Sequence, residues 1–393
     1  MSRLSMQAQD ADSPHSVSLV EALKTGWNAA RLRPWTVSVW RCLRTEIHYI
    51  RMFLWPDVVL LEGRTKSGTS LSVLRAGNSD RQTAYFFAGQ VLTEICVERI
   101  LGRRWLWALP ALARKHGCAF VILRVARHRA TLARRILGHD VAALHLPAFV
   151  QATVDVTDRK RLLRSHSLRD DVRRIRDLGF QFSLSRKKHD LDTFISEYHD
   201  PYVKTVHGFD AIAMDFQRLR ASCSNGEMPE PWLLLKVILG GEWVAGVLLV
   251  NGVDRAALME IGVQNGDLTL VKRKVLQAAY WLSLEYLRRQ GHKRVSLMLT
   301  RPFLMNGVLQ YKLKYSPALT VARPADGFLL IYNLASDAAR EILLREAFLV
   351  FMGDSLGAVW FTRDSAPSPV PSSIPIDRLC IAGIRKVEPV ALR

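Results

Sequence analysis

The second half of the chain carries the clearest pattern of hydrophobic positions. Residues 232–250 (WLLLKVILGGEWVAGVLLV) hold two apolar, β-rich runs on either side of Gly240 and Gly241, which predicts a β-hairpin. A third apolar run at 256–263 predicts a strand after the hairpin. Further short apolar runs predict buried strands at 293–299, 318–323 and 327–333.

Between these strands, residues 270–291 have the spacing of a helix. Their apolar positions recur every three or four residues: Val271, Val275, Ala278, Ala279, Leu282 and Tyr286. The helix is predicted to end at Gly291, with Arg288 and Arg289 in its last turn. Strands and a helix thus alternate, which predicts an α/β fold with a mixed sheet.

The first half contains one unit of comparable layout. Residues 107–125 (WALPALARKHGCAFVILRV) predict a helix that ends at Gly117 and is followed by a strand. Residues 286–299 repeat this order of basic residues, a glycine and a buried strand. The similarity weakly suggests that the chain contains two related halves.

A basic amphipathic helix is predicted between the halves, within residues 163–185. Its apolar face consists of Leu168, Val172, Ile175 and Leu178, and the rest carries Arg169, Arg173, Arg174 and Arg176. The helix is predicted to end at Gly179. A second helix is predicted within residues 190–210, where Asp190 or Asp192 can cap its start.

The two ends of the chain differ in composition from the rest. Residues 1–18 are polar, predict a flexible tail and lack the apolar centre of a secretory signal. Residues 363–376 are rich in Pro and Ser and predict a linker. No apolar run reaches the ~18–20 residues needed to cross a bilayer. We therefore expect a cytoplasmic location.

The charge balance adds most to this picture. The 393 residues carry a net charge of +19, and residues 101–190 hold 20 Lys and Arg against 7 Asp and Glu. Such a surface attracts polyanions, namely nucleic acid, anionic lipid or the phosphates of a cofactor, or it simply keeps the protein soluble. The five cysteines are widely spaced without a C-x-x-C pair, and the eleven histidines are scattered, so we expect free thiols and no metal site.

Common catalytic motifs are absent from the sequence. It contains no P-loop, no G-x-G-x-x-G, no H-E-x-x-H and no G-x-S-x-G. Nucleotide hydrolysis, dinucleotide redox chemistry, zinc proteolysis and esterase chemistry therefore lack their usual sequence support.

Five segments occur in a characteristic order. They are LRDDVRRIRDLGF, DTFISEYHDPYVKTVHG, LLLKVILGGEWVAGVLLV, ALMEIGVQNGDLTLVKRKVLQAAYWLSLEYLRRQG and RPFLMNGVLQYKLKYSP. This ordered set resembles the Fem-type (FemAB-like) acyltransferases of the GNAT N-acyltransferase superfamily. The resemblance covers residues 150–335, and residues 60–150 are similar by layout alone.

The resemblance implies two tandem GNAT-like halves. Residues 19–155 would form a degenerate first half, and residues 156–335 a second half with the active cleft. Residues 336–393 would add a C-terminal helix, the linker and a tail. The implied activity is transfer of an acyl or aminoacyl group from a thioester or ester donor to an amine of a cell-envelope, polysaccharide or lipid-related acceptor.

The resemblance also assigns roles to single residues. In RPFLMNGVLQYKLKYSP, Lys312 occupies the lysine position of the family's cleft segment and is expected to be a cationic donor, with Tyr311 or Tyr315 as the acid. Glu260 lies in the strand beside the acceptor and is the expected general base. Substrate contacts are expected from Arg301, Asn306 and Tyr202. Where the family commonly has an aromatic residue and Gly, this chain has Tyr315-Ser316-Pro317.

The donor loop departs from the family pattern. GNAT enzymes that use coenzyme A hold its pyrophosphate on a Gly-rich loop, whereas residues 263–274 (VQNGDLTLVKRK) contain one glycine. The expected donor contacts are Asn265, Gly266, Lys272, Arg273 and Lys274. Either these cations compensate for missing backbone contacts and the donor is an acyl-coenzyme A, or the donor is an acidic acyl carrier protein or an aminoacyl-tRNA.

A second reading comes from a different functional class. A GNAT-like scaffold without catalysis can use its arginine-rich helix to hold nucleic acid or anionic lipid. The same cations also allow an acyltransferase to work peripherally at an anionic membrane. Binding of acyl donors and the dependence of polyanion binding on salt distinguish these readings.

Overall fold

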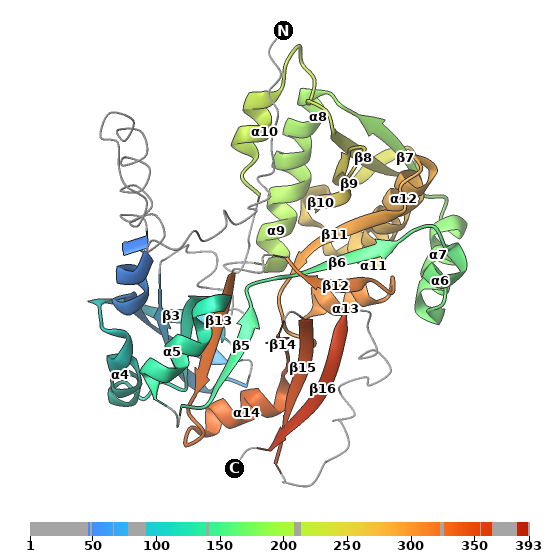
Figure 1. Cartoon of the computed structure of the whole chain (residues 1–393). Helices are drawn as coiled ribbons and strands as arrows, with labels where there is room; N and C mark the ends of the chain where they lie inside the picture. Colours follow the sequence, from blue (N-terminus) through green and yellow to red (C-terminus); the bar gives the residue numbers. More distant parts are fainter. Residues whose placement is uncertain are drawn as a thin grey trace, which may run out of the picture. The chain divides into compact units, whose positions relative to one another are not determined.

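The computed structural model describes residues 46–47, 49–65, 67–77, 92–138, 141–207, 214–322, 326–353, 355–363 and 383–391. The chain divides into two compact units, Met1–Met52 and Phe53–Arg393. The three sheets and the helices that pack on them all belong to the second unit (Figure 1). The tail predicted at 1–18 lies outside the described residues, as does the linker predicted at 363–376 except for its first residue.

The first sheet has the strand order β3-β1-β2-β4-β13-β5. Its strands are β1 (Asp57–Thr65), β2 (Ser70–Ala76), β3 (Leu92–Arg103), β4 (Phe120–Ala126), β5 (Ala143–Pro147) and β13 (Asp326–Tyr332). Strands β2 and β4 run parallel, and the other recorded pairs are antiparallel. Helices α4 (Leu109–Lys115) and α5 (Ala130–Leu137) pack their apolar residues against this sheet. The predicted helix–Gly117–strand unit is therefore confirmed as α4 and β4.

The second sheet has the order β12-β6-β11-β10-β9-β8-β7. Its strands are β6 (Val150–Asp155), β7 (Gln181–Ser185), β8 (Trp232–Leu239), β9 (Glu242–Asn251), β10 (Ala256–Val263), β11 (Arg294–Thr300) and β12 (Ala318–Val321). The predicted hairpin is confirmed as β8 and β9. The prediction of a single helix at 270–291 is wrong in one respect, because the structure has two helices there. Lys274, with φ 74°, separates α11 (Leu268–Lys272) from α12 (Val275–Arg289).

Helices cover both faces of the second sheet. On one face, α12 and the basic helix α7 (His166–Asp177) share a hydrophobic cluster with residues of β6, β8, β9 and β10. The opposite face receives α8 (Lys188–Thr193), the π-helical turn η4 (Phe194–His199) and α9 (Asp200–His207), followed by α10 (Phe216–Ser222) (Figure 1). There Phe194 and Tyr198 pack against Leu234 and Leu248.

A third sheet, which the sequence pattern did not predict, consists of β14 (Ala347–Met352), β15 (Ser355–Thr362) and β16 (Ile384–Ala391). Two further short helices are α6 (Arg159–Leu162), just before α7, and α13 (Gly307–Leu313), between β11 and β12. Helix α14 (Asp337–Arg345) precedes β14. No helix in the described ranges is long and apolar enough to span a membrane.

The predicted mixed α/β class is confirmed by these sheets. In each of the two large sheets, the helix–glycine–strand unit leads into a strand that joins its neighbour in parallel, β4 beside β2 and β11 beside β10. The boundaries at 155/156 and 335/336 remain predictions. The sheets divide the chain somewhat differently, because β6 already belongs to the second sheet and β13 returns to the first.

Candidate active site

Strands β10 and β11 part after a single paired position. The two strands are parallel, and Ala257 with Ser296 is the one pair recorded between them in the described part of the chain. Strand β11 is irregular where they part: its register with β6 shifts between Ser296 and Leu299, and Met298 has φ 62°. Apart from that pair, the described residues of the two strands have no ladder pairing with each other, and this stretch is called here the β10–β11 gap.

Lys312 lies at the irregular part of β11. Asn306 caps α13, and the lysine in the last turn of this helix donates from Nζ to the carbonyl oxygens of Leu299 at 2.8 Å and Met298 at 3.4 Å. The residue is 2% exposed. Burial lowers the pKa of Lys312 to about 7, although the negative charge of Glu260 acts in the opposite direction.

The amine of Lys312 keeps some of its bonding capacity. Within the described ranges, its two hydrogen bonds go to the carbonyls of Met298 and Leu299. A protonated amine has a third N–H, and a neutral amine has a lone pair. In either state, Lys312 can make one further hydrogen bond to a bound molecule.

A β-bulge determines where Glu260 points. Strand β10 pairs with β9 through Leu258 with Leu249, and then through Glu260 with Leu248, so Met259 is the extra residue. Leu258 and Leu249 belong to the cluster under α12, whereas Leu248 belongs to the cluster under η4. The bulge therefore moves Glu260 from the α12 face to the η4 face.

On that face, Glu260 meets a histidine that the sequence analysis did not select. His199 is fully buried; its Nε2 lies 3.3 Å from Glu260 Oε2 and its Nδ1 lies 2.8 Å from Asp200 Oδ1. Burial lowers the pKa of His199, but the hydrogen bonds to Glu260 and Asp200 outweigh it, and the net shift is upward. The available signal was its position, four residues after Ile195, on the apolar face of a predicted helix.

Tyrosines of α9, α12 and α13, together with Tyr315 just after α13, pack in or against one hydrophobic cluster. Tyr280 of α12 contacts the rings of Tyr311 and Tyr315 at centroid distances of 4.9 and 5.8 Å, and the hydroxyls of Tyr311 and Tyr315 lie 3.2 Å apart. Tyr202 of α9 packs against the same hydrophobic cluster. Burial raises the pKa of all four hydroxyls, and the charges of Tyr202 and Glu260 act in the same direction on Tyr280. These hydroxyls therefore remain protonated at neutral pH.

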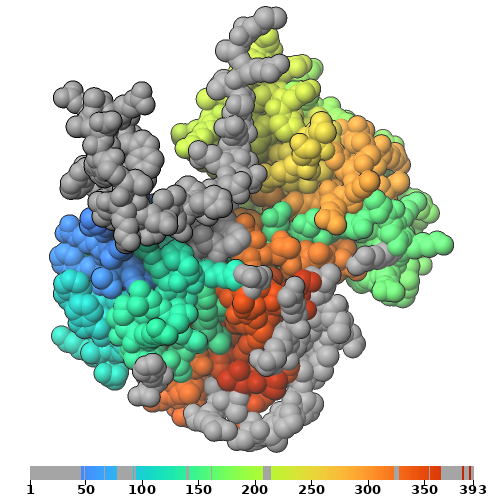
Figure 2. All heavy atoms as spheres, in the orientation of Figure 1, coloured from blue at the N-terminus to red at the C-terminus, as the bar shows by residue number. Residues whose placement is uncertain are grey.

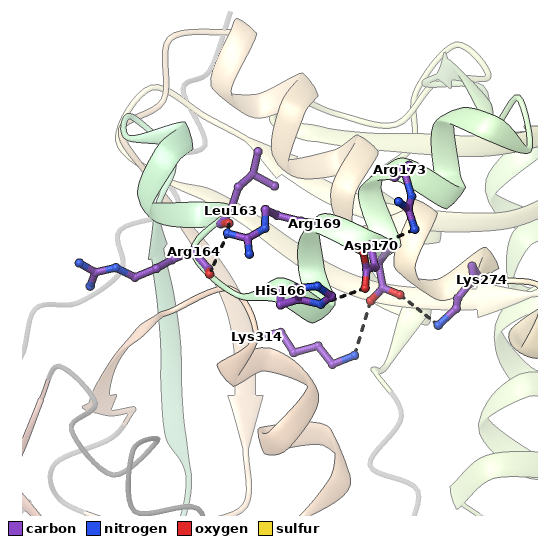
Figure 3. Close-up of polar contacts among 9 residues, drawn as sticks. Leu163, Arg164, His166, Arg169, Asp170, Arg173, Lys274 and Lys314 are labelled. Carbon is purple, nitrogen blue, oxygen red and sulfur yellow. Dashed lines mark hydrogen bonds and ion pairs between the residues drawn. The ribbon is translucent and has the colours of Figure 1, made fainter.

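A buried carboxylate joins the basic helix to this site. Asp171 of α7 is 4% exposed and pairs with Lys274 Nζ at 3.0 Å and Lys314 Nζ at 3.5 Å. Figure 3 labels these two lysines. Lys314 Nζ also lies 5.5 Å from the centroid of the Tyr311 ring. Asp171 thus fixes α7 to the start of α12 and to the end of α13.

Of the predicted donor-loop residues, Lys274 contacts Asp171, and the others lie elsewhere. Lys274 takes part through Asp171, while Lys272 and Arg273 are exposed at the end of α11. Asn265 is exposed in a turn at φ 52°. At Gly266, an added Cβ would lie 2.7 Å from the Pro201 carbonyl oxygen, so this glycine allows the turn to pack against α9.

Two predicted substrate contacts have distinct positions. The side-chain oxygen of Asn306 accepts from the backbone N–H groups of Val308 and Leu309, so it caps α13. Arg301 is half-buried and directly follows β11. The charge of Glu260 thus acts on Lys312 and Tyr280, and Tyr280 contacts the rings of Tyr311 and Tyr315, whereas Asn306 has a structural task in α13.

A cavity elsewhere in the chain does not contain these residues. It measures about 320 Å³ and lies at the first sheet, where Arg114, Cys118 and Tyr332 contribute to its lining. Burial raises the pKa of the Cys118 thiol to about 12, which disfavours a nucleophilic thiolate. The described residues contain no group of three or more His, Cys, Asp or Glu side chains that could hold a metal ion.

Comparisons with known proteins give similarities at the level of solved structures. No family model matches the chain, and no curated protein matches it. The L-PGS structure from Bacillus licheniformis is 12% identical, with 70% of this chain and 84% of that chain covered and a TM-score of 0.32. FemX is 10% identical, with 68% of this chain and 83% of that chain covered and a TM-score of 0.35. A GCN5-related N-acetyltransferase from Sphaerobacter thermophilus is 11% identical, with 70% of this chain and 80% of that chain covered and a TM-score of 0.29. These three TM-scores are all below 0.5, so the similarity carries no conclusion about function.

Proposed function

We propose that this chain is an N-acyltransferase that moves an acyl or aminoacyl group from a thioester or ester donor to an amine. The observation that carries the proposal is the β10–β11 gap, where a half-buried carboxylate, Glu260, and a buried amine, Lys312, interact electrostatically beside four protonated tyrosines.

Each group suits one step of the transfer. The nitrogen of the neutral acceptor amine attacks the carbonyl carbon of the donor and gives up one proton to Glu260. The unused N–H of protonated Lys312 stabilises the negative charge that develops on the carbonyl oxygen. The bond from carbon to the donor sulfur or oxygen breaks, and the leaving group takes a proton from Tyr311 or Tyr315. The tyrosine then regains a proton from solvent, and Glu260 releases the proton that it accepted. Lys312 suits this task because its amine is fixed by two carbonyls before substrate binds.

The donor and acceptor classes follow from charge. Lys272 and Arg273 are exposed just before Lys274, and cations there match the phosphates of an acyl-coenzyme A or the acidic surface of an acyl carrier protein. The exposed arginines of α7 favour an acceptor amine on an anionic lipid or glycan at a membrane surface. In Figure 2 the α6–α7 segment (green, on the right) lies at the surface.

Thermal unfolding with a panel of donors tests the proposal. The panel contains acetyl-, succinyl- and long-chain acyl-coenzyme A, an acyl carrier protein thioester and an aminoacyl-tRNA. A donor present at 100 times its Kd should stabilise the fold by about 2.7 kcal/mol and raise Tm, and the same donor without its acyl group serves as the control. If no member of the panel shifts Tm, the enzyme reading is contradicted.

A second candidate function is supported by the charge on α7. Arg169, Arg173, Arg174 and Arg176 are all exposed on this helix, as expected for a protein that holds nucleic acid or anionic lipid without catalysis. Binding of polyanions that weakens steeply with salt, in a protein whose Tm responds to no acyl donor, would favour this candidate.

A further inference from the structure

The buried histidine beside Glu260 has no role in the chemistry proposed above. Both of its ring nitrogens face carboxylate oxygens, at 2.8 Å for Asp200 and 3.3 Å for Glu260. Asp200 has a side chain 62% exposed and Glu260 one 25% exposed, whereas His199 has no exposed surface. A buried ring thus joins a surface carboxylate to the carboxylate at the β10–β11 gap.

Geometry determines the protonation state of this ring. A neutral imidazole has one N–H, and an ionised carboxylate can only accept. Both contacts are hydrogen bonds only when both nitrogens carry a proton. Two aromatic rings also contact the imidazole: Phe216 of α10 at 4.9 Å and Phe194 of η4 at 6.0 Å between centroids. In the described residues, no further charged group from α8, α9, α10, β9 or β10 acts on His199.

The backbone around His199 is built for this contact. The ring lies at the end of a π-helical turn. This conformation is rare in proteins overall, but many of its occurrences are at functional sites. Opposite the turn, β10 has Gly262, where an added Cβ would lie 2.6 Å from the backbone nitrogen of His199. The wide turn and the missing side chain together let His199 approach the strand that carries Glu260.

We propose that His199 is an imidazolium clamp, a positioning residue that is fixed by Asp200 and holds Glu260 Oε2 so that Oε1 faces the acceptor amine. Oε1 has no recorded partner in the described ranges, so it is available to the substrate. The inference rests on the proposed function for the identity of the amine, but the clamp itself is a property of the free protein. The net upward shift in the pKa of His199 agrees with it.

Histidine-selective ¹⁵N NMR on the full chain tests the clamp without any substrate. At pH 7.5 the His199 ring, identified by its absence in His199→Gln, should carry protons on both nitrogens. In Glu260→Gln the pKa of His199 should fall, because one of the two carboxylates that raise it is gone. A neutral His199 ring at pH 7.5, or a titration that Glu260→Gln leaves unchanged, would overturn the proposal.

Kinetics then test whether the clamp positions the base. Asp200→Asn changes an exposed side chain and should leave the fold intact. We expect kcat to fall about tenfold or more and KM to change little. A general base contributes about 10²–10⁴-fold to the rate, and a misplaced base should lose part of this factor. The control is His128→Gln, an exposed histidine beside the first sheet, which should retain full activity. Wild-type rates in Asp200→Asn would refute positioning even if the NMR result holds. If the wild-type protein transfers no acyl group at all, the proposed function fails, and the NMR result alone decides the clamp.

Discussion

Lys312 is buried at a cost in stability, and this cost depends on pH. Burial lowers its pKa from 10.5 to about 7, so between these values the unfolded chain binds more protons than the folded chain. The free energy of unfolding therefore rises with pH across this window. Below about pH 7 the lysine is charged in both states and the full penalty applies, and above 10.5 the penalty is gone.

Comparison with Lys312→Met measures this contribution. Methionine keeps the length of the side chain and removes the titrating group. The variant's free energy of unfolding relative to that of the wild type should be highest at pH 7 and should decrease toward pH 10. Urea unfolding at several pH values, with Lys115→Met as the exposed control, gives the difference. A difference that is independent of pH would mean that the amine titrates normally.

Single residues were predictable to different degrees. Glu260, Lys312, Tyr202, Tyr311 and Tyr315 were selected from the sequence, and the charge of Glu260 acts on Lys312 in the structure. Tyr280, whose ring contacts Tyr311 and Tyr315, was missed. His199 was missed because its role depends on Glu260, which lies 61 positions later in the sequence. Asn306 was expected at the substrate, yet its amide oxygen caps α13, a local task that a loop asparagine before a helix commonly has.

At the scale of elements, the bulge at Met259 and the π-helical turn determine the site. Strand β10 was predicted from its apolar run, but the run does not reveal the extra residue that turns Glu260 to the other face. In the same way, a helix was predicted within 190–210, while its π-helical turn depends on contact with the sheet. Local periodicity therefore gives the elements, and close packing between them gives the orientation of the site.

Gly262→Ala tests this packing. The new Cβ would lie 2.6 Å from backbone atoms of Tyr198 and His199, neither of which can rotate away. We expect a loss of about 1–3 kcal/mol in the free energy of unfolding. At Gly307 an added Cβ meets nothing within 4 Å, so Gly307→Ala is the matched control with little change. Equal effects in the two variants would show that η4 does not pack on β10 as described.

On the scale of the whole molecule, the two large sheets repeat one layout but carry different residues. The first has its cavity near Cys118 and Tyr332, whereas the second has its gap between parallel strands with Glu260 and Lys312. The full chain carries a net charge of +19. Composition predicted this basic character, and the mixed α/β class followed from the alternation of strands and helices. The third sheet was not predicted, because β14, β15 and β16 follow one another without a helical signal between them.

The most direct test of the proposed function is single-turnover transfer with the donor that raises Tm. Three proteins are compared at pH 6.5, where Lys312 is mainly protonated: Glu260→Gln, Lys312→Met and the control Lys115→Met. The account predicts that Glu260→Gln lowers the rate by about 10²-fold or more, and that Lys312→Met does so by about 10²–10³-fold, with donor binding retained. Lys115→Met should match the wild type. Wild-type rates in both site variants, with transfer intact, would contradict an active site at the β10–β11 gap.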